Sequence, residues 1–231
     1  NEDRFLHDEA AGFYGVADGV GGLPGGAEAA QLAIDELTAA LRAAPADREA
    51  DLPAAFRALN ESVRLLGQRM NPQTGIATTL TAGLVRAGVL RIGHVGDSRA
   101  YLSRKGVLKR ITEDHSLENE VRRRRAMGEL VSYRESQRNA LTRCIGQPTP
   151  LEVDVFSETL AAGDRVLFCT DGITRLVPDR ELGEMLATPK LASHCCQSAM
   201  ALRPKPDEPC MNKTTGTLAL PSWGALLSGP K

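Results

Sequence analysis

Apolar residues recur along this chain with two periodicities, one that predicts strands and one that predicts helices. Residues 11–17 first alternate and then become continuously apolar, as a strand buried in a core does. Between residues 26 and 42 the apolar positions recur every three or four residues, and residues 52–69 repeat that spacing. We therefore predict a strand followed by two amphipathic helices, the second of which ends at Asn71-Pro72.

The middle of the chain predicts consecutive antiparallel strands. Apolar runs at 77–86, 89–95 and 99–103 are separated by turn residues, and Lys105-Gly106 marks a further hairpin. Residues 116–138 are polar and predict a helix, strands are expected again at 151–156 and 165–169, and a short helix begins near Asp179. Strands followed by helical pairs, without regular alternation of strand and helix, predict an α+β fold.

Composition narrows the class of protein. The 231 residues are 42% hydrophobic and 25% charged, with a formal net charge of −1, which is typical of a soluble globular domain. This balance gives no bulk electrostatic reason to bind nucleic acid or membrane, and no apolar run reaches the length of a membrane span. The five cysteines lack metal-ligand spacing, so we expect a reduced, cytoplasmic protein.

Carboxylates follow two of the predicted strands. Asp18-Gly19 and Asp171-Gly172 each come directly after an apolar run, and acidic residues also occur at 1–3 and 114–116. A carboxylate at the end of a buried strand, beside glycine, can face a cleft. Several such carboxylates that converge would make a hard-oxygen site suited to Mg²⁺ or Mn²⁺.

Each acidic residue also has a structural interpretation. Glu2 and Asp3 could belong to a solvated terminus, and Asp18 and Asp171 could cap turns. For Asp97, in a Gly-Asp-Ser corner between strands, we expect a structural role. His115 is expected to make a loop hydrogen bond, and arginines 122–125 to form a solvated helix face, although beside a metal site they could attract a phosphopeptide.

Taken together, the motifs resemble the metal-dependent serine/threonine phosphatases of the PPM family (PP2C type) in their bacterial form. The matching segments occur in the family's order within residues 1–186, at 1–3, 16–30, 93–102, 112–116, 139–146 and 163–173. The resemblance implies two stacked, mostly antiparallel sheets flanked by helix pairs, with a metal centre at one end. It also implies a single domain over 1–231. The composition changes from about residue 187, so we expect 187–231 to be a divergent C-terminal segment and 224–231 a loose tail.

The resemblance assigns roles to particular residues. Asp18 would bridge two Mn²⁺ or Mg²⁺ ions, the Gly19 carbonyl would join one of them, and Glu2 and Asp171 would complete further positions. Asp3 would bind metal directly or through water, and Asp114 would hold a looser third ion. Asp3, Asp18 and Asp171 are thus the expected catalytic residues.

The implied activity is hydrolysis of phosphoserine and phosphothreonine in proteins by water that the metal activates. The substrates would be proteins phosphorylated by bacterial serine/threonine kinases, and the phosphatase itself is expected to be a monomer. The motifs specify phosphoryl chemistry and not the leaving group, so a hydrolase of another phosphorylated molecule stays open.

Three departures from the family pattern matter. The family's phosphate-binding arginine precedes the Glu-Asp pair and lies outside this sequence, and Val20 stands where eukaryotic members carry histidine. Met211 stands where the last metal-binding aspartate belongs, and thioether sulfur is a poor ligand for these ions. Asp207 or Glu208 could replace it. The alternative function is therefore a catalytically impaired, phosphatase-like binding or regulatory module.

Overall fold

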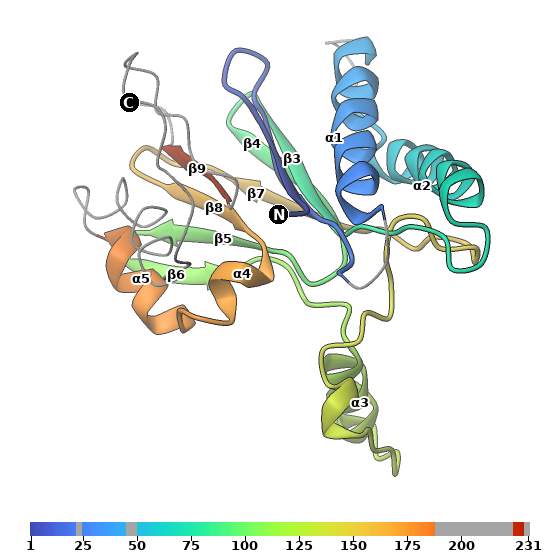
Figure 1. The fold of residues 1–231 in the computed structure, drawn as a ribbon. Coiled ribbons are helices and arrows are strands. Elements are labelled where there is room, and N and C mark those ends of the chain that lie inside the picture. The colour runs from blue at the N-terminus through green and yellow to red at the C-terminus, as the bar shows by residue number, and fades with distance from the viewer. Residues whose placement is uncertain (22–24, 45–49, 188–223, 229–231) are drawn as a thin grey trace, which may run out of the picture.

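Strand pairing builds two antiparallel sheets that stack face to face (Figure 1). The computed structural model describes residues 1–21, 25–44, 50–187 and 224–228. The five-stranded sheet has the order β1 (Asp3–Asp8), β2 (Phe13–Asp18), β3 (Leu80–Arg86), β4 (Val89–Val95), β7 (Asp154–Thr159). The four-stranded sheet has the order β6 (Val107–Arg110), β5 (Arg99–Arg104), β8 (Arg165–Cys169), β9 (Gly224–Ser228). This arrangement confirms the predicted α+β sandwich.

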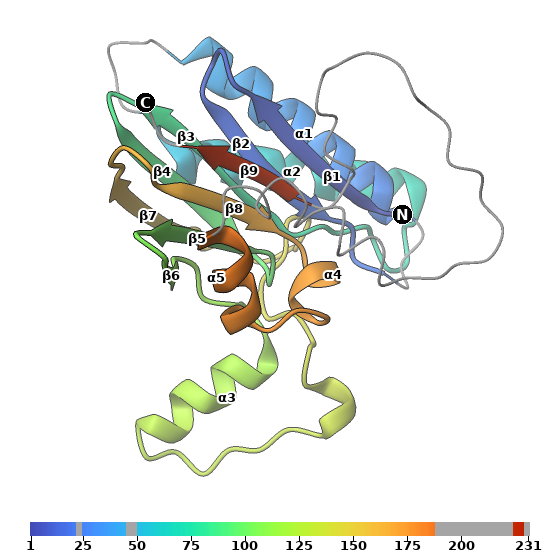
Figure 2. The same ribbon diagram turned by 90° about the vertical axis from the view of Figure 1, so that its left-hand side faces the viewer.

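Helices cover the outer faces of both sheets (Figures 1 and 2). α1 (Gly26–Ala43) and α2 (Leu52–Met70) lie against the five-stranded sheet, as their spacing predicted, while α4 (Asp171–Thr174) and α5 (Asp179–Ala187) lie against the other. Apolar side chains fill the three layers between these four levels. Because burial of apolar surface is the main driving force, these layers fix the separation of the two sheets.

α2 shows how local chemistry sets an element's position. Asp51 precedes the helix, and its Oδ1 accepts a hydrogen bond from the Ala54 N–H at 2.9 Å. Phe56 points from the helix into the sheet and is fully buried. Its ring lies over Gly93 of β4, where a Cβ would come within 2.7 Å of the ring. The absence of a side chain at Gly93 therefore lets the helix approach the sheet closely.

α3 (Leu117–Ala126) projects away from the sandwich in both views (Figures 1 and 2). Val121 is its one buried residue. The chain enters and leaves this excursion side by side: Ser116 pairs with Leu141, and the Leu117 N–H donates to the Ala140 carbonyl at 2.8 Å. We call this paired stretch the neck.

Several predicted boundaries need correction. The helix expected over 116–138 ends at Ala126, because Gly128 takes a left-handed conformation with φ 88°, and only a 3₁₀ turn, Glu135–Gln137, follows. β3 starts at Leu80 and β7 at Asp154, three residues later than expected in each case. The sequence interpretation also missed β1.

The C-terminal expectations have mixed outcomes. Residues 224–228, expected in a loose tail, form β9, which pairs with β8 in the four-stranded sheet. The interpretations placed on Asp207, Glu208 and Met211 lie outside the described residues. Across the described ranges, none of the helices combines the length and apolar character needed to cross a membrane.

We expect Phe56→Ala to destabilise the protein by about 3–5 kcal/mol, because it leaves a cavity between α2 and the sheet. Leu65→Ala on the same helix is the control, since Leu65 is 40% exposed. Urea unfolding measures both variants. Equal losses of unfolding free energy would contradict the packing described.

Candidate metal centre

β1 and β2 place two carboxylates side by side. In the antiparallel pair the residue opposite Asp3 is Asp18, and opposed residues direct their side chains to the same face. The neighbouring Asp3 carboxyl group acts to raise the pKa of Asp18. Two carboxyls so close cannot both be ionised without a cation nearby.

The end of β2 is held by two threonines that directly precede β3. The Thr79 hydroxyl accepts from the Asp18 N–H at 3.0 Å, and the Asp18 carbonyl accepts from the Thr78 hydroxyl at 2.9 Å and the Thr79 N–H at 2.8 Å. Gly19 continues this pairing, since its N–H donates to the Glu2 carbonyl at 3.3 Å. The strand end is therefore fixed before any ligand binds.

The opposite side of the site comes from the second sheet. Asp171 begins α4 directly after β8, and Asp97 lies in the corner between β4 and β5. Gly96 enters this corner with φ 114°, where an added Cβ would lie 2.5 Å from the Thr79 side chain. The Ser98 hydroxyl bonds that of Thr79 at 2.8 Å. The Ser98 hydroxyl thus pins the corner, while Asp97, for which we expected a structural role, lines the pocket.

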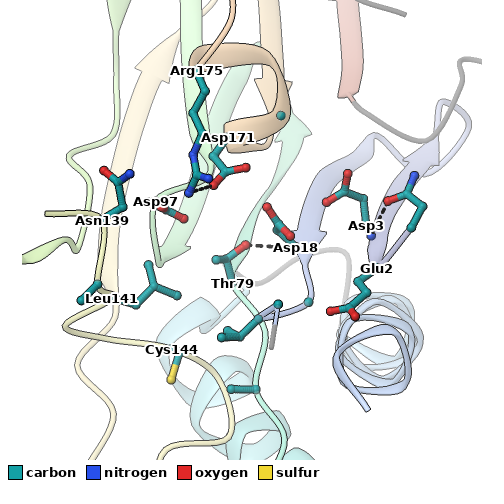
Figure 3. A pocket seen from close by; sticks show the side chains of 17 residues that line it. Glu2, Asp3, Asp18, Thr79, Asp97, Asn139, Leu141, Cys144, Asp171 and Arg175 are labelled. Carbon is teal, nitrogen blue, oxygen red and sulfur yellow. Dashed lines mark hydrogen bonds and ion pairs between the residues drawn. The ribbon is translucent and has the colours of Figure 1, made fainter. Parts of the chain in front are cut away.

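These groups surround one pocket of about 640 Å³ (Figure 3). The predicted residues Glu2, Asp3, Asp18, Gly19 and Asp171 all line it, so the structure brings together side chains far apart in sequence. The other described lining residues are Asn1, Val20, Gly21, Ala77, Thr79, Asp97, Asn139, Ala140, Leu141, Cys144, Gly172 and Arg175. None of the arginines 122–125 is among them.

The pocket's electrostatics favour a cation. Burial, together with the carboxylates of Asp3 and Asp171, raises the pKa of Asp18 to about 9. Burial and the negative charge of Asp171 raise the pKa of Asp97 to about 6, although the Arg175 guanidinium acts to lower it. Without added positive charge, the pocket therefore retains protons on its carboxyl groups.

Glu2 supplies a second reason to place a cation here. Its Oε2 is buried and, within the described part of the chain, has no hydrogen-bond partner. This oxygen lies against the start of α1, so that a Cβ at Gly26 would fall 2.2 Å from it. A buried carboxylate oxygen without a partner is costly unless something binds it, and a hard metal ion fits that requirement.

The carboxylates line the pocket, but they do not converge on a single ion position. Among the described residues, no three His, Cys, Asp or Glu side chains are gathered tightly enough to hold an ion by themselves. Mg²⁺ and similar ions usually keep several water ligands and bind proteins through one or two carboxylates. The residues thus fit hydrated divalent ions, and the individual ligand roles stay predictions.

Asp114 lies elsewhere. It borders a separate, smaller pocket, and its carboxylate is held by two arginines. Arg99 contacts it through Nη2 at 2.7 Å and Nε at 2.9 Å, and Arg110 through Nη2 at 2.5 Å. The structure does not bring Asp114 to the other predicted ligands, and its part in holding a third ion stays a prediction.

His115 makes the loop hydrogen bond expected of it, and His94 has a structural role beside it. The His115 Nδ1 accepts from the Gly96 N–H at 3.1 Å, which leaves Nε2 to donate to Asp154 at 3.2 Å. The His94 Nε2 donates to the Glu113 carbonyl at 2.8 Å. Burial lowers the pKa of His94 to about 3, so this ring stays neutral in the core.

Sequence reasoning missed Asn139 and Arg175 as pocket residues. Asn139 lies in the segment 139–146, which matches the family pattern, but the resemblance assigned no function to any residue of that segment. Arg175 follows Asp171 by one helical turn, so its place beside that carboxylate could have been found from the spacing alone.

Comparisons with known proteins place this chain among phosphatases. A family model for protein phosphatase 2C matches residues 1–212. The serine/threonine phosphatase Stp of Listeria monocytogenes is 32% identical over 183 residues, which are 77% of this chain and 73% of that protein. The serine/threonine protein phosphatase PstP of Mycobacterium tuberculosis is 33% identical over 193 residues, which are 83% of this chain and 37% of that protein.

Solved structures agree with the sequence relatives. A serine/threonine phosphatase from S. agalactiae superposes with a TM-score of 0.75 at 27% identity, over 87% of this chain and 86% of that one. The catalytic domain of PstP, solved in complex with two manganese ions, superposes with a TM-score of 0.71 at 31% identity. That superposition covers 87% of this chain and 84% of the PstP chain.

The carboxyl crowding predicts a pH-dependent stability in the metal-free protein. Asp18 holds its proton in the folded state up to about pH 9 but releases it near 3.8 when unfolded. The stability linked to this group is therefore complete below about pH 4 and is lost as the pH rises toward 9. Asp18→Asn cannot ionise, so in EDTA we expect it to melt a few degrees above wild type at pH 8 and level with it near pH 4.

Two controls accompany this experiment. Asp35→Asn, on the exposed side of α1, should follow wild type at both pH values. Added Mn²⁺ should raise the melting temperature of wild type more than that of Asp18→Asn, because the ion binds the folded state. A variant that melts below wild type at pH 8 in EDTA would refute the crowding.

Proposed function

The chain belongs to the protein phosphatase 2C family, and from this premise we propose that it hydrolyses phosphoserine and phosphothreonine esters in proteins with divalent metal ions as cofactor. The observation that carries the proposal is the pocket in which both sheets present carboxylates to one another. Relatives named as serine/threonine phosphatases support the substrate class.

Glu2, Asp3, Asp18, the Gly19 carbonyl and Asp171 are the groups that would hold Mn²⁺ or Mg²⁺. When bound, a pair of such ions makes water nucleophilic at neutral pH and offsets the negative charge of a phosphoryl group. Phosphate monoesters hydrolyse extremely slowly without a catalyst, so both effects are needed.

The chain's own contribution is preorganisation. Thr78 and Thr79 hold the backbone of Asp18, and Ser98 holds the corner that carries Asp97. These anchors lie in the core, so the carboxylates need little rearrangement when ions and substrate enter. Fixed placement of charged groups is a major source of rate enhancement.

The biological setting is also part of the proposal. We propose that the phosphatase acts in the cytoplasm, as a monomer, on proteins phosphorylated by bacterial serine/threonine kinases. Its bacterial relatives, which are named as serine/threonine phosphatases, support phosphoproteins as substrates, and the near-neutral net charge of −1 supports a partner that is neither nucleic acid nor membrane. A single domain over 1–231 with a divergent segment from 187 is also part of the proposal, and the match of one family model to residues 1–212 supports a single domain. Nothing in the comparisons favours the impaired binding module.

Purified protein should release phosphate from a phosphoserine peptide and from p-nitrophenyl phosphate only when Mn²⁺ or Mg²⁺ is present. Asp18→Ala should lower kcat by at least about 100-fold, because it removes the carboxylate that lies between the others. Phosphate release and calorimetric titration with Mn²⁺ measure the two properties.

Asp35→Ala is the matched control, since Asp35 is exposed on α1 and outside the pocket. It should retain wild-type turnover. Turnover that persists in EDTA or in Asp18→Ala would disprove the proposed function. At most one Mn²⁺ per chain with no turnover would point instead to the binding module.

A further inference from the structure

The pocket has an uneven charge distribution. Its described lining contains five carboxylate side chains, from Glu2, Asp3, Asp18, Asp97 and Asp171, and one basic side chain, from Arg175. A phosphoryl dianion that enters this pocket is repelled by every unneutralised carboxylate. Positive charge from the protein itself is therefore valuable wherever it faces the pocket.

Arg175 stands on one side of the pocket. Its guanidinium reaches toward Asp171 and lies on the side of Asp97, across from Glu2 and Asp3 (Figure 3). Its Nη2 pairs with Asp171 Oδ2. The side with Glu2 and Asp3 has no basic lining side chain among the described residues. The side with Asp97 and Asp171 has Arg175, so there a guanidinium can contact an anion directly.

The Arg175 guanidinium has more hydrogen-bond donors than its ion pair with Asp171 uses. Its side chain is 56% exposed, whereas that of Asp171 is 25% exposed. Asp171 is its one ion-pair partner among the described residues, and a guanidinium carries five N–H donors in a planar fork. A second, anionic partner can therefore bind from solvent without breaking a buried contact.

The base of the side chain is fixed. The Arg175 N–H donates to the Asp171 carbonyl at 2.9 Å, and the neighbouring Ile173 and Val177 are buried in the layer beneath the four-stranded sheet. Only the side chain beyond the backbone is free to adjust. A rigid base with an adjustable, charged end is suited to holding a ligand in one orientation.

We propose that Arg175 binds the phosphoryl oxygens of the substrate and orients them over the carboxylate pocket. Arginine matches phosphate oxygens with two parallel hydrogen bonds, which a lysine cannot reproduce. This assignment rests on the proposed phosphatase function. It assigns the phosphate-binding role to the one basic side chain in the described lining of the pocket.

The test compares Arg175→Gln, Arg175→Lys and wild type at saturating Mn²⁺. We expect Arg175→Gln to raise KM for a phosphoserine peptide about tenfold and to weaken calorimetric binding of inorganic phosphate by a similar factor, as the loss of one charged hydrogen-bonding partner predicts. Arg175→Lys should lie between the two, because it retains the charge but not the fork.

Arg180→Gln is the matched control. Arg180 also pairs with a carboxylate one helical turn away, Glu184 at 3.1 Å, but it is 91% exposed on α5 and outside the carboxylate pocket. It should leave KM and phosphate binding unchanged.

Two results would overturn the assignment. Arg175→Gln could bind phosphate as wild type does and shift only the Mn²⁺ concentration for half-maximal activity, in which case Arg175 is solely a counter-ion of Asp171. Arg180→Gln could weaken phosphate binding equally, in which case the effect is general to surface charge. The proposed phosphatase function can fail independently of this assignment. In that case the wild-type protein would show no Mn²⁺-dependent turnover, and the calorimetric measurement of phosphate binding would still test the role of Arg175.

Discussion

Mutual repulsion of carboxylates in one half-buried pocket is the constraint on which this site depends. Asp3 and Asp18 come from one sheet, Asp171 follows a strand of the other, and Asp97 lies in the corner that joins the two. The packing of the sandwich therefore forces them together. The apolar layers supply the free energy that opposes the repulsion, and protons or metal ions must supply the missing positive charge. The packing of the two sheets thus determines both the fold and the need for metal ions in the pocket.

Much of the architecture could be predicted because its signals are local. Helices α1 and α2 follow from apolar spacing, and the hairpins β3–β4 and β5–β6 follow from their turn residues. Asp18 and Asp171 could be assigned to the site because each lies at the end of a buried strand, Asp18 as the last residue of β2 and Asp171 two residues after β8. β1 was missed because the apolar Phe5 is exposed and the acidic Asp3 is buried, which breaks the expected alternation.

The remaining site residues depend on contacts that the sequence does not display. Asp97 and Asp114 both stand in acidic motifs beside strands, yet the fold turns Asp97 into the pocket and surrounds Asp114 with Arg99 and Arg110. The outcome is set by which face of β5 and β6 each arginine occupies. The motifs therefore predicted the region of the site. The ion pairs with Arg99 and Arg110 in the folded protein determine that Asp114 is neutralised and that Asp97 lines the pocket.

The neck beneath α3 has an evolutionary consequence. Residues 117–140 leave the sandwich and return to it through one short paired stretch, Ser116 with Leu141, and contribute a single buried helical residue, Val121. Insertions, deletions and charge changes in such an excursion cost the core little. Because Asn139 at its base borders the pocket, this segment is free to diversify beside unaltered chemistry. Related enzymes could in this way acquire new protein targets while the hydrolytic machinery stays the same.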